Sequence, residues 1–139
     1  MKKIFALFLF CTIAFTSFSQ RKSKNHKVVI QFVSADTLSQ YALVNNLKNL
    51  REGWPTAQIE VVFHGPGIAM ALPNKTKFNK ELQDFVENKN IVMVVCENTM
   101  KQRKITKEQL LPFMGSVPMG IGEIIMKQEA GWAYLKGGL

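Results

Sequence analysis

The chain has 139 residues, 47% hydrophobic and 20% charged side chains, and a formal charge of +8 at pH 7. This length corresponds to one domain, and the composition is typical of a globular protein with a buried core. It excludes a disordered chain and an array of sequence repeats.

The first 19 residues predict a secretory signal peptide. Lys2 and Lys3 give a basic start, residues 4–18 are uncharged and mostly apolar, and Ser17 and Ser19 supply the small residues of a cleavage site. The apolar run is shorter than the roughly 18–20 residues that span a bilayer, so we expect no membrane attachment after cleavage. The alternative is a retained N-terminal anchor. The predicted organisation is a signal peptide at 1–19, a basic leader at 20–26 and a single domain at 27–139, exported to the periplasm or secreted.

Cleavage would leave Cys96 as the single cysteine, because Cys11 lies in the removed segment. The loss of Lys2 and Lys3 would lower the formal charge by two. A lone cysteine in an exported protein indicates a reactive thiol, an intermolecular disulfide or a small buried apolar side chain.

The chain up to Cys96 alternates between strands and helices. Apolar runs rich in β-branched residues predict strands, and apolar residues at helical spacing predict helices. Ser34-Ala35-Asp36 offers capping side chains for the start of the first helix, which is expected to end at Gly53 and Pro55. The strands are expected at residues 28–33, 58–63 and 91–95, and the second helix at residues 77–88.

The alternation continues after Cys96 with shorter elements. Thr106 to Gln109 has the form of a capping box. The elements expected there are a short helix from Thr106 toward Phe113, a strand at 117–118, a helix at 120–130 with Ile121, Ile124 and Ile125 facing inward, and a strand at 132–135. Strands that alternate with helices predict a three-layer α/β/α sandwich with a mostly parallel sheet of about five strands.

Cys96 is the leading candidate for a catalytic residue because it ends the buried run IVMVVC. In open α/β sheets, ligands bind beyond the carboxyl ends of the strands. A helix that began at Glu97 or Asn98 would favour a thiolate through its N-terminal dipole, although a carboxylate of Glu97 facing the sulfur would oppose it. Asn98 and Thr99 could donate hydrogen bonds to the sulfur or to a bound anion, or could simply cap the helix.

His64 is the second candidate, since it also follows a predicted strand. Parallel strands end at the same edge of a sheet, so an imidazole there could assist deprotonation of Cys96. The alternative is an ordinary turn residue. Gly65 and Gly67 flank Pro66 and predict a tight turn that lets the backbone approach the site closely.

Several other classes of site are excluded or weak. Gly120-Ile121-Gly122 lacks the third glycine of a dinucleotide-binding motif. One cysteine and two histidines, with His26 at the opposite strand end, predict no metal site, and we expect no cofactor. A basic cluster of Lys101, Arg103, Lys104 and Lys107 is a solvated face or attracts an anionic partner. It lacks the interleaved aromatic residues of a nucleic-acid interface.

Four segments together resemble the DsrE/DsrF-like family, the group around intracellular sulfur oxidation proteins. They are HKVVIQFV (26–33), VVFHGPG (61–67), VVCENT (94–99) and VPMGIGEIIMKQEAGWAY (117–134). The resemblance implies a small α/β/α domain that assembles as a trimer or hexamer. It also implies that Cys96 carries sulfur as a persulfide and hands it to a partner.

These observations give one leading hypothesis and two alternatives. The leading one is an exported sulfur-handling protein, in which Cys96 takes sulfur from a donor and passes it to an acceptor protein or small thiol while His64 tunes its protonation. The first alternative is a non-catalytic oligomeric module that binds a small ligand in a crevice near Glu123 and Trp132. The second is a thiol redox sensor.

Overall fold

A computed structural model describes residues 25–138 of the chain. They form one five-stranded sheet in the order β4-β3-β2-β1-β5, in which every pair of neighbouring strands is parallel. The elements are β1 (Lys27–Phe32), α2 (Thr37–Gly53), β2 (Gln58–Phe63), the 3₁₀ helix η1 (Gly65–Ala71), α3 (Asn79–Glu87), β3 (Ile91–Cys96), α4 (Glu97–Arg103), the 3₁₀ helix η2 (Lys107–Gln109), β4 (Gly115–Val117), α5 (Gly120–Glu129) and β5 (Ala133–Lys136).

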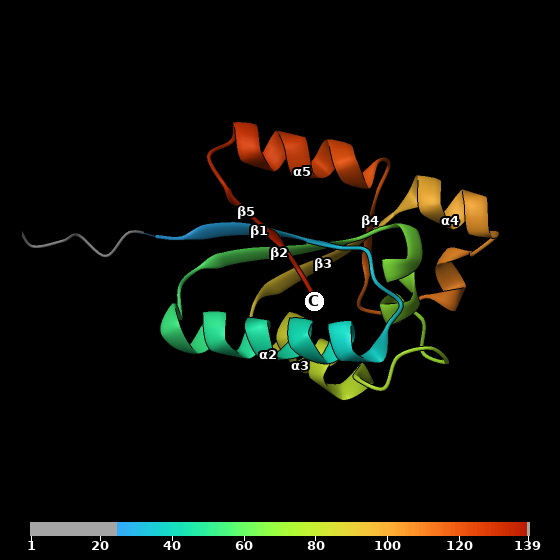
Figure 1. The fold of residues 1–139 in the computed structure, drawn as a ribbon, viewed down its shortest axis with the longest axis horizontal. Helices are drawn as coiled ribbons and strands as arrows, with labels where there is room; N and C mark the ends of the chain where they lie inside the picture. The colour runs from blue at the N-terminus through green and yellow to red at the C-terminus, as the bar shows by residue number, and fades with distance from the viewer. Residues whose placement is uncertain (1–24, 139) are drawn as a thin grey trace, which may run out of the picture.

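The predicted three-layer architecture is confirmed. Helices α2 and α3 cover one face of the sheet, α5 lies across the other, and α4 extends beyond the carboxyl end of β3 (Figure 1). The α2/α3 side holds the larger apolar core. The α5 side holds a small one, formed by Val29, Val62, Val94 and Ile124. The second face is therefore only partly covered, and Val92 of β3 is 50% exposed.

Helix α2 begins and ends where the sequence predicts. The Asp36 carboxylate accepts a hydrogen bond of 2.8 Å from the Ser39 amide, which satisfies a free donor of the first turn. The helix ends at Gly53, just before Pro55. Leu43 and Leu47 are fully buried against the sheet, as their spacing requires.

Two predictions for the second half of the chain are wrong in detail. The capping box of Thr106 and Gln109 is present, but it caps only the short 3₁₀ helix η2 and no helix reaches Phe113. In α5, Ile124 is buried as predicted, whereas Ile121 and Ile125 are 57% and 50% exposed. The side of α5 that faces the sheet carries Gly120 and Ile124 instead, so the two outer isoleucines point away from it.

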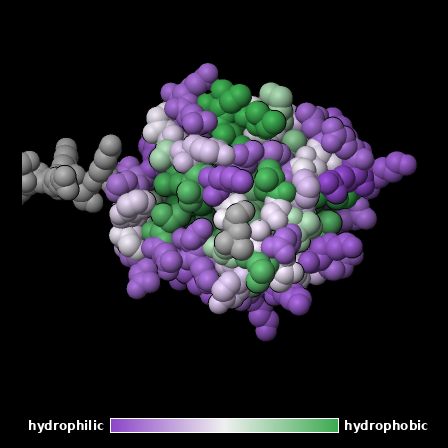
Figure 2. All heavy atoms as spheres, viewed as in Figure 1, coloured by the Kyte–Doolittle hydropathy of each residue, from purple (hydrophilic) through white to green (hydrophobic). Residues whose placement is uncertain are grey.

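The outer side of α5 is consequently apolar. Ile121, Ile125 and Met126 are exposed on it, next to the exposed Met119 that precedes the helix. Figure 2 shows hydrophobic side chains gathered at the top of the view, where Figure 1 places α5. Within residues 25–138, no helix is both long and apolar enough to cross a membrane. The predicted signal peptide lies outside the described residues.

Candidate functional site

Cys96 lies at the junction of β3 and α4. It is the last residue of the strand and the N-cap of the helix that begins at Glu97. The residue is only 6% exposed, and its thiol is free. The prediction that a helix begins directly after the cysteine is confirmed, so the sulfur faces the N-terminal turn of α4.

The surroundings of the sulfur favour its charged form. Burial alone raises the pKa of the Cys96 thiol, but the backbone N–H groups of Gly120, Thr99 and Asn98, together with the Thr99 hydroxyl, outweigh it and hold the pKa below its ordinary value. The neutral thiol makes no close capping hydrogen bond. These donors act mainly on a thiolate, which is a much stronger acceptor than a thiol.

Gly120 brings a second helix to the sulfur. It is the first residue of α5, and a Cβ atom placed on it would lie 3.1 Å from the Cβ of Cys96, 3.2 Å from Cγ1 of Val62 and 3.3 Å from the Cβ of His64. Only a residue without a side chain lets the N-terminus of α5 approach this closely. The amide ends of α4 and α5 therefore converge on one thiol.

Asn98 and Thr99 take part differently from each other. The Asn98 side chain is exposed, and the residue contributes its backbone N–H. Thr99 is buried, its hydroxyl accepts a hydrogen bond of 3.1 Å from the Gly65 amide, and the same hydroxyl is among the groups that lower the pKa of the Cys96 thiol. The Glu97 carboxylate accepts a hydrogen bond from the Ser116 hydroxyl at 2.8 Å and is not among the groups that shift the thiol pKa.

His64 lies beside Cys96 without being bonded to it. Both Cβ atoms flank Gly120, so the topology brings the two candidate residues to the same edge of the sheet. The imidazole is half-buried, and this burial lowers its pKa. Its Nε2 atom lies 2.8 Å from Nε2 of Gln31, and the Tyr134 hydroxyl donates to Oε1 of Gln31. His64 is therefore tied to a polar chain on β1 and β5.

The Gly65-Pro66-Gly67 segment is not the isolated tight turn that the sequence suggests. It opens the seven-residue 3₁₀ helix η1. Gly65 has a φ of 53°, in the left-handed region that favours glycine. Gly67 approaches β1, where an added Cβ would lie 2.2 Å from the carbonyl oxygen of Phe32. Both glycines thus position the backbone that follows His64.

The model of the DsrE/DsrF-like family matches residues 22–136. The chain belongs to the DsrE/DsrF-like family. No curated protein matches it significantly.

Two solved structures share the fold of this DsrE/DsrF-like chain. The protein of unknown function MTH1491 from Methanobacterium thermoautotrophicum is 24% identical, with a TM-score of 0.75 over 80% of this chain and 98% of its own. The conserved protein of unknown function BT1422 from Bacteroides thetaiotaomicron is 18% identical, with a TM-score of 0.58 over 83% of this chain and 97% of its own. At these identities they support the fold alone.

In this DsrE/DsrF-like protein, Glu123 belongs to a charged cluster with Lys127 and Glu60, separate from Cys96. Its carboxylate lies 3.5 Å from Nζ of Lys127, which pairs at 2.6 Å with the buried Glu60 of β2 and lies 4.4 Å from the centre of the Trp132 ring. Glu123 is thus engaged with Lys127, and it is not among the groups that act on the thiol. Among the described residues, no group of three or more His, Cys, Asp or Glu side chains could hold a metal ion.

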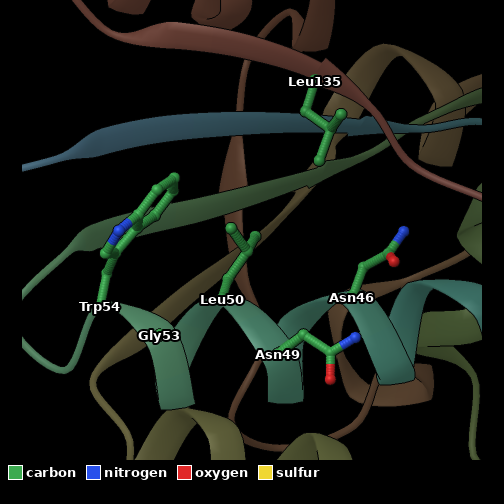
Figure 3. A pocket seen from close by; sticks show the side chains of 6 residues that line it. All are labelled: Asn46, Asn49, Leu50, Gly53, Trp54 and Leu135. Carbon is green, nitrogen blue, oxygen red and sulfur yellow. The ribbon is translucent and has the colours of Figure 1, made fainter.

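A groove on the other side of the sheet contains none of the predicted site residues. It has a volume of about 480 Å³, between α2 and β5, and is lined by Asn46, Asn49, Leu50, Gly53, Trp54 and Leu135 (Figure 3). Near it, His26 stacks on Trp54 with ring centres 3.9 Å apart. Neither Glu123 nor Trp132 lines this groove, so it is not the crevice that the ligand-binding alternative predicted.

Three residues of the site were missed by the sequence analysis. Gly120, Gln31 and Tyr134 lay within predicted elements and within the segments of the family resemblance, and Gly120 also within the failed dinucleotide motif, but none was assigned to the site. A polar residue within an apolar strand, as in VVIQFV, is the available signal for Gln31. Contacts between β1, β5 and the start of α5 carry no local signal in the sequence.

Proposed function

We propose that the protein carries sulfane sulfur on Cys96 as a persulfide. Membership of the DsrE/DsrF-like family suggests a sulfur-related function. The observation that carries the finer proposal is the place of Cys96 at the start of α4 with the start of α5 packed against it at Gly120, where the backbone N–H groups of Gly120, Thr99 and Asn98 lower the thiol pKa. A thiolate is the form of cysteine that attacks sulfur.

The reaction is a displacement at sulfur. The Cys96 thiolate attacks the outer sulfur of a persulfide donor R–S–SH, a new S–S bond forms at Cys96, the S–S bond of the donor breaks, and R–S⁻ leaves and takes up a proton. In the second step, the thiolate of an acceptor attacks the outer sulfur on Cys96 in the same way and releases the Cys96 thiolate. The sulfane sulfur moves without a net change of oxidation state, so neither step needs an outside oxidant.

The same amide groups serve both steps. They stabilise the thiolate of Cys96 before attack, and they stabilise it again when it leaves after transfer. Because Cys96 is only 6% exposed, we expect small persulfides to react faster than bulky ones. A protein partner would have to present its sulfur at the carboxyl edge of the sheet.

The test uses the full chain with Cys11→Ser, so that Cys96 is the only cysteine. After incubation with a small alkyl persulfide, the intact mass is expected to rise by one sulfur atom, and a reductant should reverse the gain. The rate of alkylation against pH should give a thiol pKa below the ordinary value of about 8.5. A Cys11→Ser/Cys96→Ser chain is the matched control and should gain nothing. An unchanged mass of the Cys11→Ser chain would end the proposal.

Substitutions at Thr99 and Asn98 distinguish a side-chain donor from a backbone donor. Thr99→Val keeps the shape of the side chain but removes the hydroxyl, so we expect the thiol pKa to rise and the alkylation rate at neutral pH to fall roughly ten-fold, the worth of one hydrogen bond to a charged group. Asn98→Ala should leave the thiol pKa unchanged, because Asn98 contributes its backbone N–H. The alkylation profile measures both variants. A larger rise in Asn98→Ala than in Thr99→Val would contradict this assignment of donors.

Homo-oligomerisation is part of the same proposal. The exposed apolar residues Ile121, Ile125 and Met126 of α5, on a face of the sheet that one helix only partly covers, support burial against other copies of the chain. A trimer or hexamer is expected. Its molar mass in solution can be measured by light scattering, and a monomer at all concentrations would contradict it. The site would then act in the periplasm or outside the cell, as the sequence of residues 1–19 predicts.

A further inference from the structure

Gln31 is an unusual residue for its position. It lies near the carboxyl end of β1, between strands β2 and β5, in a run that is otherwise apolar. Its amide nitrogen faces Nε2 of His64 at 2.8 Å, and its amide oxygen accepts the hydroxyl hydrogen of Tyr134. In this orientation both ends of the half-buried amide are hydrogen-bonded, the nitrogen to the imidazole and the oxygen to the phenol.

That orientation determines the tautomer of His64. An amide nitrogen only donates hydrogen bonds, so Nε2 of the imidazole must accept and cannot carry a proton. The neutral ring then carries its proton on Nδ1, the ring nitrogen that Gln31 leaves free. Nδ1 is also the nitrogen nearer to Cβ, and the Cβ atom of His64 lies beside Gly120, as that of Cys96 does.

The geometry assigns Gln31 and Tyr134 as positioning residues that hold His64 in the Nδ1–H form, so that His64 donates a hydrogen bond to sulfur at Cys96. This inference rests on the proposed persulfide chemistry for its use. It replaces the role of a base with that of a donor, because the amides and hydroxyl around Cys96 already favour the thiolate. The N–H group at Nδ1 can donate a hydrogen bond to R–S⁻ as the donor's S–S bond breaks; the ring keeps its proton, and R–S⁻ takes up a proton from water.

The first measurement is the tautomer itself. The chain has two histidines, so ¹⁵N-labelled His26→Gln protein leaves His64 as the only imidazole signal. Long-range ¹H–¹⁵N NMR at neutral pH should show the proton on Nδ1. In Gln31→Glu, a carboxylate that only accepts should move the proton to Nε2, and Tyr134→Phe should give a mixture because the amide can then turn over. A proton on Nε2 in the otherwise unchanged chain, or the same tautomer in all three proteins, would overturn the assignment.

The second measurement separates positioning from general structural damage. Alkylation of Cys96 by iodoacetamide releases iodide and needs no proton donor, whereas sulfur uptake from an alkyl persulfide releases a basic thiolate. In the Cys11→Ser chain, Gln31→Glu should slow sulfur uptake about ten-fold and change the alkylation rate less than two-fold. Gln31→Met keeps the size of the side chain but neither of its hydrogen bonds. Its rate of sulfur uptake should lie between those of the Cys11→Ser chain and of Gln31→Glu.

The tautomer of His64 and its role as a donor are tested separately. If Gln31→Glu slowed alkylation and sulfur uptake equally, Gln31 would have a structural role and His64 would not be a donor to the sulfur. If Gln31→Glu slowed neither reaction, the donor role of His64 would also be overturned. If the chain with native Gln31 takes up no sulfur, the proposed function fails and the donor role fails with it, while the NMR experiment still decides whether Gln31 and Tyr134 fix the tautomer.

Discussion

Gly120→Ala is expected to raise the pKa of the Cys96 thiol and to destabilise the protein. The new methyl group would lie 3.1 Å from the Cβ of Cys96 and 3.3 Å from the Cβ of His64. These Cβ atoms are fixed by the backbone at the ends of β3 and β2 and cannot swing away as the tip of a long side chain can. The N-terminus of α5 must therefore retreat, which lengthens the approach of the Gly120 amide to the sulfur.

Two measurements follow this change. Overpacking of this kind costs about 1–3 kcal/mol in the free energy of unfolding, which urea denaturation can measure. The raised thiol pKa leaves less thiolate at neutral pH, so alkylation at that pH should slow roughly ten-fold, the worth of one hydrogen bond to a charged group. If the pKa and stability of Gly120→Ala both stayed at their original values, Gly120 would not be the close contact on which the site depends.

Gly122→Ala is the matched control on the same helix. The added Cβ would lie 2.4 Å from Cε of Met119, the far end of a flexible side chain that is 54% exposed and free to turn away. Alanine also stabilises a helix interior by about 0.5–1 kcal/mol relative to glycine. We therefore expect equal or higher stability and an unchanged thiol pKa. Only the glycine that touches Cys96 should matter for its chemistry.

The strands and the two leading site residues were predictable because their signals are local. The run IVMVVC followed by ENT shows a buried strand passing directly into a helix, and a parallel sheet then brings the ends of β2 and β3 to one edge. Cys96 and His64 follow from those two facts. The structure confirms their proximity, although their roles remain proposals.

The donors that act on Cys96 were harder to predict because one of them comes from a distant part of the chain. The Gly120 amide reaches the sulfur from 24 positions along the sequence, through the packing of α5. The rotation of α5 also escaped prediction. Three isoleucines suggested one apolar side facing the core, whereas contacts of Gly120 and Lys127 with the sheet turn Ile121 and Ile125 outward. An exposed apolar side of a helix looks in sequence like an apolar core.

Lys127→Met is expected to lower the free energy of unfolding by about 3–5 kcal/mol at neutral pH. Glu60 is 4% exposed in the middle of the sheet, and its Oε2 lies 2.6 Å from Nζ of Lys127 while its Oε1 has no hydrogen-bond partner. Removing the ammonium group leaves a buried carboxylate beside that of Glu123. Urea denaturation at one protein concentration measures the loss. Lys101→Met, at an exposed position of α4, should change stability by less than about 0.5 kcal/mol.

The pH dependence of this loss identifies its cause. Burial already holds the pKa of Glu60 above its ordinary value of 4.5, and loss of Lys127 removes the groups that lower it. The folded variant then binds a proton more tightly than the unfolded chain, so its stability falls as pH rises from about 4.5 through the raised pKa. Lys127→Met should therefore recover part of its stability at about pH 5 compared with about pH 8. The double variant Glu60→Met/Lys127→Met, with no buried charge left, should recover most of it at both pH values, because an apolar pair replaces a buried ion pair at little cost. A double variant as unstable as Lys127→Met would show instead that the Lys127 ammonium group over the Trp132 ring holds α5 to the sheet.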